Sequence, residues 1–241
     1  YFQAYSNTYA PLERLRDLYE EALRYPGVTG LVIGTRPDCV DDEKIEYISG
    51  LARKHYIAVE YGIESCYDKT LSRINRQHSF EEAVNAVKKT VAGGINTGAH
   101  FIFGLPGETR QEMLDEAAAI SKMPLTTVKF HQLQIMKGTV MEKEYREHPD
   151  DFLRFSMDEY ISFIIEFLER LNPAIVVERF TGEAPPRFLA EIAWDKTRTE
   201  QLGIMIEKRM EELDTWQGRL FKTTVKQDGR AGGHQGIRAS G

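Results

Sequence analysis

The chain has 241 residues, a net charge of −6 and an isoelectric point near 5.6, and 41% of its residues are hydrophobic. These values suit one large α/β domain with a sizeable core and exclude a general attraction to nucleic acid, leaving room only for a local basic groove. No run of about 18 apolar residues is present, and residues 1–11 resemble neither a signal peptide nor a transit peptide, so a cytoplasmic protein is expected.

Strands and helices alternate along the first three quarters of the chain, which is the pattern of a parallel α/β fold. Strands are expected at residues 1–7, 30–35, 57–63, 97–103, 126–132 and 174–180. Helices are expected at residues 11–24, 42–54, 65–74, 79–91, 109–122 and 160–171, and Ser65 with Asp68 is expected to cap the third. Three helices open with a Ser or Thr followed three residues later by Glu, which predicts capping boxes: Ser79 with Glu82, Thr109 with Glu112, and Ser156 with Glu159.

The pattern changes after the last of these strands. Only helices are expected between residues 185 and 213, and the sequence from about residue 222 is rich in Gly and polar residues, which is typical of a disordered tail. We therefore divide the chain into a barrel-like domain at residues 1–182, a helical extension at residues 183–221 and a tail at residues 222–241.

Polar and apolar side chains alternate along three of the expected strands. At residues 59–64, Val, Tyr and Ile alternate with Glu60, Gly62 and Glu64, and the same alternation isolates His100, and then Lys129 and His131, on one face of later strands. Parallel strands covered by helices present apolar side chains to those helices, so the polar set is expected to face the interior of a sheet or barrel. Buried carboxylates and histidines are costly unless they bind a partner, so this face predicts a ligand site.

Ligands of parallel α/β folds bind at the carboxyl ends of the strands. The polar residues expected there are Gln3, Asn7, Arg36, Asp38, Glu60, Glu64, Arg76, His100, Lys129 and His131. A set with both charge signs suits a zwitterionic ligand, such as an amino acid joined to a nucleoside, better than a bare phosphate.

Each of these residues also has a purely structural interpretation. Glu64 could be a solvated strand end, Arg76 could satisfy the last carbonyl groups of its helix, and His100 could be a hydrogen-bonded interior histidine. The sequence Gly-Leu-Pro-Gly at residues 104–107 could be only a tight turn. Because the alternation recurs in three strands, we favour a common site over separate structural roles.

Several short motifs, in this order, are similar to those of the radical S-adenosylmethionine (SAM) superfamily. They are YFQAYSNTYAP at residues 1–11, IGTRPDC at 33–39, GIES at 62–65, DKTLSRINR at 68–76, HFIFGLPGET at 100–109 and HQLQIMKGT at 131–139. Over about residues 1–180 the set resembles the YhcC-type branch, which is related to the elongator catalytic subunit.

This resemblance implies a partial (β/α)6 TIM-like barrel, amino-terminally truncated here and followed by a helical extension. It also implies two cofactors, SAM and a 4Fe–4S cluster, and reductive cleavage of SAM to methionine and a 5′-deoxyadenosyl radical. The electron would come from a donor such as flavodoxin or ferredoxin. The elongator likeness favours an RNA substrate, whereas the acidic charge disfavours one, so the substrate stays open.

By analogy with oxygen-independent coproporphyrinogen dehydrogenase, the resemblance implies roles for three residues. Glu64 would contact the ribose of SAM, Arg76 would pair with the methionine carboxylate, and His100 would lie near the ribose hydroxyl groups.

Four further residues are implied as cofactor-binding with less specific roles. Gln3 and Asn7 follow the strand that usually carries a Gly-Gly-Glu motif for the methionine amine, but that motif is absent here. Lys129 and His131 are expected to face the same cavity and to contact either the adenosyl group or the substrate.

The largest departure from the family concerns the cluster. The superfamily holds it with Cys-x3-Cys-x2-Cys, whereas this sequence contains only Cys39 and Cys66, which cannot supply three thiolates. Two idle thiols are expected instead. Because the chain also begins in the middle of a strand pattern, we expect an amino-terminally truncated piece that lacks the first strand, the cluster loop and the activity.

Two other functions stay open at this point. One is an ordinary acid–base barrel enzyme with Glu64 and His100 as acid and base, which would be active without iron or SAM. The other is a degenerate barrel that binds a nucleotide or a partner protein.

Overall fold

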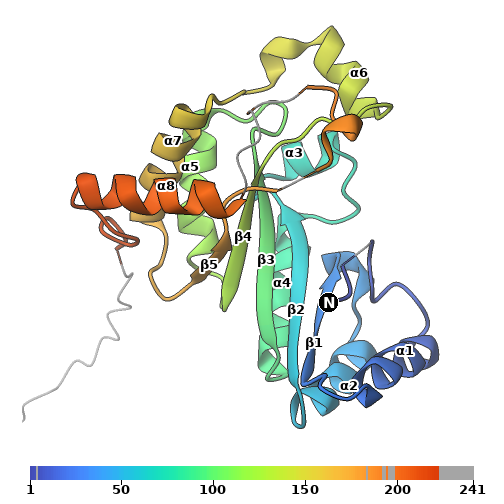
Figure 1. The fold of residues 1–241 in the computed structure, drawn as a ribbon. Coiled ribbons are helices and arrows are strands. Elements are labelled where there is room, and N and C mark those ends of the chain that lie inside the picture. Colours follow the sequence, from blue (N-terminus) through green and yellow to red (C-terminus); the bar gives the residue numbers. More distant parts are fainter. Residues whose placement is uncertain (4, 183, 192–193, 195–198, 223–241) are drawn as a thin grey trace, which may run out of the picture.

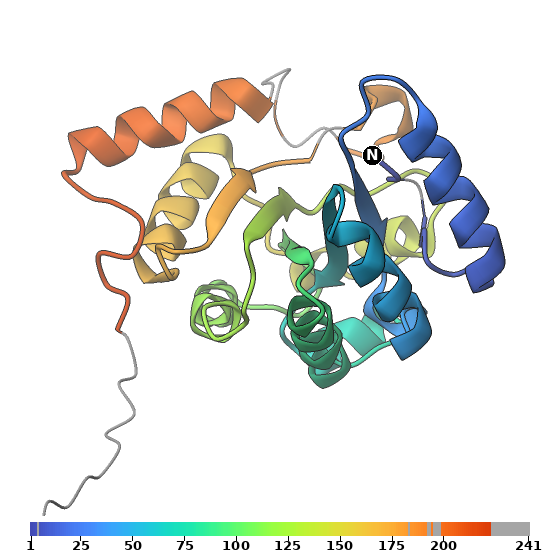
Figure 2. The same ribbon diagram turned by 90° about the horizontal axis from the view of Figure 1, so that it is seen from below.

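The computed structural model describes residues 1–222 apart from residues 4, 183, 192–193 and 195–198 (Figure 1). Its centre is one parallel sheet whose spatial order follows the chain: β1 (Gly30–Thr35), β2 (Tyr56–Glu64), β3 (Asn96–Phe103), β4 (Thr127–Gln132) and β5 (Val176–Arg179). Figure 2 shows the connecting helices around the outside of the curved sheet. The five parallel strands form the partial TIM-like barrel that the sequence predicts.

The principal helices are α1 (Leu12–Arg24), α2 (Asp42–Ala52), α4 (Phe80–Ala92), α5 (Arg110–Ile120), α7 (Met157–Arg170) and α8 (Thr199–Glu212). Shorter ones are α3 (Asp68–Arg73), α6 (Val140–Glu147) and the 3₁₀ turns η1 (Pro37–Cys39), η2 (Pro149–Asp151) and η3 (Pro186–Phe188). The predicted capping boxes begin α4, α5 and α7, and in each the Ser or Thr hydroxyl and the Glu carboxylate accept reciprocal backbone hydrogen bonds.

The core lies between the sheet and these helices. Phe103 of β3 stacks on Phe130 of β4 with ring centroids 5.2 Å apart, and Phe163 and Phe167 of α7 meet Phe103 edge-on at 4.8 and 5.0 Å. All four side chains are buried. Because successive side chains of a strand point to opposite faces, this packing turns the polar residues between them toward the inner face.

The structure differs from the predicted elements in three places. Residues 1–7 are not a full strand: only Phe2 bridges to Ile33, and Tyr5, with φ 62°, turns the chain away. The connection after β4 contains a helix that was not predicted, α6, whose cap is Thr139. Between residues 185 and 213 the described ranges hold η3 and α8, with Leu189 in an isolated bridge to Met136.

All but the first residue of the predicted tail at residues 222–241 lies outside the described residues, as does the expected domain boundary at residue 183. None of the helices within the described ranges combines the length and apolarity that a membrane crossing requires.

Candidate functional site

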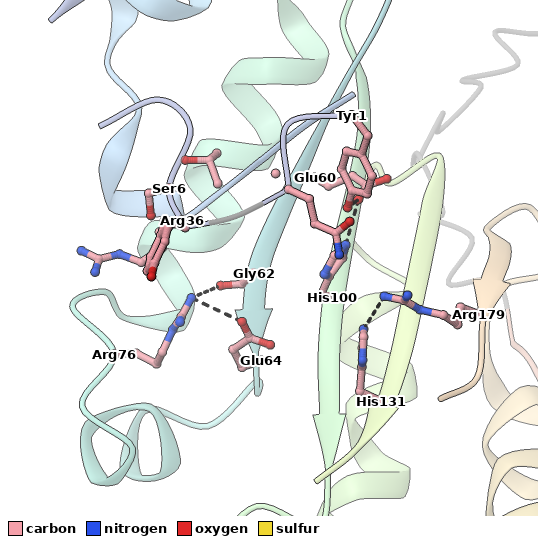
Figure 3. A pocket seen from close by; sticks show the side chains of 14 residues that line it. Tyr1, Ser6, Arg36, Glu60, Gly62, Glu64, Arg76, His100, His131 and Arg179 are labelled. Carbon is pink, nitrogen blue, oxygen red and sulfur yellow. Dashed lines mark hydrogen bonds and ion pairs between the residues drawn. The ribbon is translucent and has the colours of Figure 1, made fainter. Parts of the chain in front are cut away.

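A pocket of about 430 Å³ opens on the inner face of the sheet toward the carboxyl ends of the strands (Figure 3). Every strand contributes to it. Its lining consists of Tyr1, Gln3, Tyr5, Ser6, Gly34, Thr35, Arg36, Glu60, Gly62, Glu64, Arg76, His100, His131 and Arg179.

Glu64 and Arg76 form one wall of the pocket. The backbone of Glu64 has φ 76°, and the strand register shifts between Gly62 and Glu64, so β2 ends in a bulge. Asn75, with φ 57°, turns the chain after α3 and directs Arg76 back to β2. Arg76 Nη2 donates to the Gly62 carbonyl at 2.6 Å and lies 3.4 Å from Glu64 Oε1. Non-glycine residues in this backbone region cost about 1–3 kcal/mol each and gather at ligand sites.

Glu60 is the polar centre of the inner face. Its carboxylate accepts hydrogen bonds from Tyr1 Oη at 2.5 Å, from His100 Nε2 at 2.9 Å and from Lys129 Nζ at 2.6 and 2.7 Å. Burial opposes the charged form, but the donors, His100 foremost, hold the pKa of Glu60 at about 2. Glu60 is therefore a satisfied anion that orients His100, and not a proton acceptor for a reaction near neutral pH.

The balance between burial and neighbouring charges is reversed at Glu64. Burial raises the pKa of that carboxyl group above its usual range, and only the charges of Arg76 and His100 oppose the rise. The two carboxyl groups of β2 thus differ: Glu60 is held as a carboxylate by three donors, while Glu64 keeps oxygen atoms available to a ligand.

His131 and Arg179 form the opposite wall. Arg179 Nη2 donates to His131 Nε2 at 3.1 Å, and the His100 and His131 ring centroids lie 5.7 Å apart. Burial and then the charge of Arg179 lower the pKa of His131 to about 3, so the imidazole is neutral.

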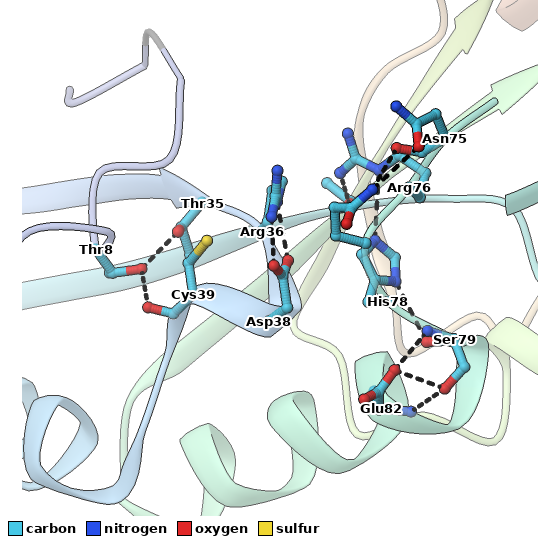
Figure 4. Close-up of polar contacts among 12 residues, drawn as sticks. Thr8, Thr35, Arg36, Asp38, Cys39, Asn75, Arg76, His78, Ser79 and Glu82 are labelled. Carbon is cyan, nitrogen blue, oxygen red and sulfur yellow. Dashed lines mark hydrogen bonds and ion pairs between the residues drawn. The ribbon is translucent and has the colours of Figure 1, made fainter. Parts of the chain in front are cut away.

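The β1 side of the pocket is braced by short polar contacts (Figure 4). Arg36 binds the Asp38 carboxylate through two nitrogen atoms, and Nε lies 2.9 Å from Oδ1. The Thr8 hydroxyl lies 2.6 Å from Thr35 Oγ1 and donates to the Cys39 carbonyl at 2.7 Å. These contacts connect the amino-terminal segment to the end of β1.

Of the seven residues expected to bind the cofactor, the structure brings five together: Gln3, Glu64, Arg76, His100 and His131 all line the pocket. The remaining two lie elsewhere. The Asn7 side chain donates to the carbonyl groups of Phe2 and Gly34 at 3.1 and 2.8 Å and so serves the backbone. Lys129 lines a neighbouring cavity of about 190 Å³, where it pairs with Glu60 and with Glu178.

Sequence reasoning did not select Tyr1 or Arg179. No motif or polar–apolar alternation in the sequence singles out Tyr1 as a pocket residue. Arg179, however, stands two residues after Val177 in the expected strand at residues 174–180, so the alternation used for the other strands applies to it as well.

The chain's thiols do not fit a 4Fe–4S cluster. Cys39 is buried beside β1, and burial, followed by the charge of Glu116, raises the pKa of Cys66 well above its usual range, which keeps it protonated. Among the residues that the structure describes, no three His, Cys, Asp or Glu side chains are grouped to hold a metal ion.

Comparisons with known proteins agree with the fold. The Radical SAM superfamily model matches residues 2–120 and the Radical_SAM C-terminal domain model matches residues 125–212. The chain is 36% identical to the uncharacterized protein YtqA of Bacillus subtilis (strain 168) over 222 residues, which are 92% of this chain and 68% of YtqA. It is 30% identical to protein YhcC of Escherichia coli (strain K12) over 199 residues, 82% of this chain and 64% of YhcC.

A solved structure shows the same fold. Elp3 of the archaeon Methanocaldococcus infernus, with an amino-terminal deletion, superimposes with a TM-score of 0.67 at 21% identity. The match covers 86% of this chain and 46% of that one, so this chain spans less than half of the Elp3 chain and about two thirds of YtqA and YhcC.

Proposed function

This chain belongs to the radical SAM superfamily, and on that premise we propose that its pocket binds S-adenosylmethionine. The family typically binds SAM together with a 4Fe–4S cluster, which supplies the electron for reductive cleavage of SAM. Because the thiols described above do not fit that cluster, formation of a 5′-deoxyadenosyl radical is proposed for the whole protein on family membership alone. A flavodoxin- or ferredoxin-type electron donor is proposed on the same basis.

The observation that supports SAM binding most directly is the arrangement of Glu64 and Arg76 around Gly62. The Arg76 guanidinium suits a planar carboxylate, and Arg76 is already fixed by the Gly62 carbonyl, so little side-chain entropy is lost when the methionine end binds. Glu64 offers acceptor atoms to ribose hydroxyl groups. A volume of about 430 Å³ falls in the range of small-molecule sites.

The other lining residues have supporting roles in this proposal. His100 is oriented by Glu60 and lies between Glu64 and His131, where it borders the ribose. Gln3, on the β1 side, is the side chain of the amino-terminal segment that we assign to the methionine amine.

Titration calorimetry of this chain with SAM tests the proposal. Arg76→Ala and Glu64→Ala should each weaken SAM binding by about tenfold or more, since each removes a charged hydrogen-bonding partner. Arg24→Ala is the matched control, because Arg24 lies on the exposed side of α1 and pairs with Glu20 on the same helix. SAM affinities of both site variants equal to that of the parent would show that these residues do not bind SAM.

A further inference from the structure

Arg179 is a basic group of the pocket lining. It ends β5 and points into the pocket toward His131 (Figure 3). Among the described residues, no carboxylate lies within ion-pair distance of its guanidinium, whose hydrogen bond goes to the neutral imidazole of His131 at 3.1 Å. Its Nε atom is buried and has no hydrogen-bond partner in the described part of the chain.

Three other basic groups around the inner face each have a carboxylate within ion-pair distance. Arg36 binds Asp38, Arg76 lies 3.4 Å from Glu64, and Lys129 lies 2.6 Å from Glu60. Since a buried donor or charge without a partner is costly, Arg179 differs from its neighbours in a way that calls for a negatively charged ligand.

Contacts among the neighbouring residues fix the position of the Arg179 side chain. A Cβ atom at Gly182 would lie 2.4 Å from His131 Nδ1, so the glycine lets the imidazole lie against the backbone after β5. Gln134 Nε2 donates to the Gly182 carbonyl at 2.7 Å, which ties that segment to the end of β4. His131 is thereby fixed with Nε2 toward Arg179, and it orients the guanidinium.

The methionine carboxylate of SAM does not account for this group. That carboxylate is assigned to Arg76, which is bonded to β2, whereas Arg179 belongs to β5, three strands away. The two guanidinium groups therefore enter the pocket from opposite walls, with His100 between them (Figure 3).

We propose that Arg179, oriented by His131, is a subsite for an anionic group, a carboxylate or a phosphate, of the molecule on which SAM acts. This assignment rests on the proposed function for the identity of SAM as the neighbouring ligand. It names the substrate class by its charge: a molecule whose acidic group binds at β5 while its reacting part faces the SAM site.

Nuclear magnetic resonance of the Arg179 Nε–H group tests the subsite with two probes, inorganic phosphate and acetate, each added to the chain with and without saturating SAM. A saturable shift of this signal is expected with at least one probe, and the stronger binder identifies phosphate or carboxylate as the preferred group. Arg179→Gln should weaken binding of that probe by about tenfold or more while changing SAM affinity by less than about twofold. Arg179→Lys, which keeps the charge but loses Nε, should give an intermediate affinity and guards against a folding defect.

Arg24→Gln is the control and should bind probe and SAM like the parent. The subsite is refuted if neither probe shifts the Arg179 signal up to about 100 mM, or if Arg179→Gln binds the probe as tightly as the parent does. It is also refuted if the probe displaces SAM, because the probe would then occupy the Arg76 side. Failure of the parent to bind SAM would instead overturn the proposed function, and the titration without SAM would still decide on Arg179.

Discussion

Gly62 leaves the space that Glu64 occupies: a Cβ atom at position 62 would lie 2.6 Å from Glu64 Oε1 and 3.2 Å from Arg76 Nη2. Real Cβ atoms essentially never approach a neighbour as closely as the first of these distances. A second glycine, Gly98, also borders a carboxylate side chain: a Cβ there would lie 2.7 Å from Thr127 Oγ1 and 3.2 Å from Glu60 Cγ. The inner face therefore accommodates its carboxylates through glycines on the same strand and on the next.

Gly62→Ala should displace the Glu64 carboxylate and the Arg76 guanidinium from their present positions. We expect SAM affinity to fall by about tenfold, and the free energy of unfolding to change by less than about 1 kcal/mol, because the atoms that must move are the ends of flexible side chains. Calorimetry and urea unfolding measure the two effects.

Gly50→Ala is the matched control. Nothing lies within 4 Å of a Cβ at Gly50, which is in the interior of α2, so alanine should raise the free energy of unfolding by about 0.5–1 kcal/mol and leave SAM binding unchanged. Parent-like SAM affinity in Gly62→Ala would contradict the idea that Glu64 and Arg76 must keep their positions.

The inner face could be predicted from sequence because a strand has a period of two. Once helices are assigned to one side, the alternation alone places Glu64, His100 and His131 on the other. The capping boxes were predictable for the same reason, since each depends on two residues at a fixed short spacing. The unpredicted helix α6 begins with the same Thr-x-x-Glu spacing, in which the Thr139 hydroxyl accepts a hydrogen bond from the backbone N–H of Glu142.

Side-chain pairing between distant strands could not be predicted. Lys129 faces inward as expected, but the register that aligns Gly62 with His100 and His100 with Lys129 brings the lysine to Glu60. The Asn7 side chain instead donates to the carbonyl groups of Phe2 and Tyr5, which come within its reach because the chain turns at Tyr5. Such choices depend on register and local turns, which composition and periodicity do not encode. The binding roles of the pocket residues stay predictions.

Glu60→Gln should destabilise the fold. Of the described acidic residues, the substitution leaves Lys129 with Glu178, at 3.2 Å, as its one partner, and removal of one member of a buried pair costs about 3 kcal/mol. The pKa of Glu60 is about 2 in the folded protein against an ordinary 4.5, so its contribution is complete above about pH 4.5 and is lost as the pH falls toward 2. Urea unfolding at pH 7 and pH 3 should show a smaller gap between variant and parent at pH 3.

Glu147→Gln serves as control for that experiment, because Glu147 is exposed and lies 3.8 Å from Lys143 on the same helix. It should change the free energy of unfolding by less than about 0.5 kcal/mol. A gap between Glu60→Gln and the parent that is equal at both pH values would argue against the low pKa of Glu60.

Gly182→Ala should act on His131 without touching Glu64 or Arg76. The added Cβ would lie 2.4 Å from His131 Nδ1, so the imidazole must rotate away from Arg179. We expect the NMR signals of the His131 ring and the Arg179 Nε–H group to shift, while SAM affinity changes by less than about twofold. Gly203→Ala in α8, where a Cβ meets nothing within 4 Å, should leave both signals unchanged. Unaltered His131 signals in Gly182→Ala would show that the glycine does not position the ring.

Glu116→Gln should stabilise the protein at high pH. Glu108 and Glu116 are both buried beside Ser65, which donates to Glu108 Oε1 at 2.5 Å, and the Cys66 N–H donates to Glu116 Oε1 at 2.7 Å. Within the described ranges neither carboxyl group forms an ion pair. Burial raises the pKa of both groups, and the charge of Glu108 raises that of Glu116 further.

The sign of the pH dependence follows from proton uptake. A carboxyl group whose pKa is raised on folding holds a proton that the unfolded chain releases, so its contribution is complete below the unfolded pKa of about 4.5 and is lost as the pH rises through the folded pKa. Glutamine keeps the Oε1 acceptor for the Cys66 N–H but never ionises. We therefore expect Glu116→Gln to exceed the parent by about 1 kcal/mol in free energy of unfolding at pH 8, and by less at pH 5.

Glu112, on the same helix, is the matched control, because its pKa is shifted in the opposite direction. A hydrogen bond from Lys69, helped by the Thr109 backbone, lowers the pKa of Glu112 to about 2, so its charge stabilises the fold at pH 8. Glu112→Gln should accordingly be less stable than the parent at that pH, also because it weakens the capping box of α5. If the difference between Glu116→Gln and the parent is the same at pH 5 and pH 8, Glu116 does not change its ionisation on folding, and the buried pair must be neutralised in another way.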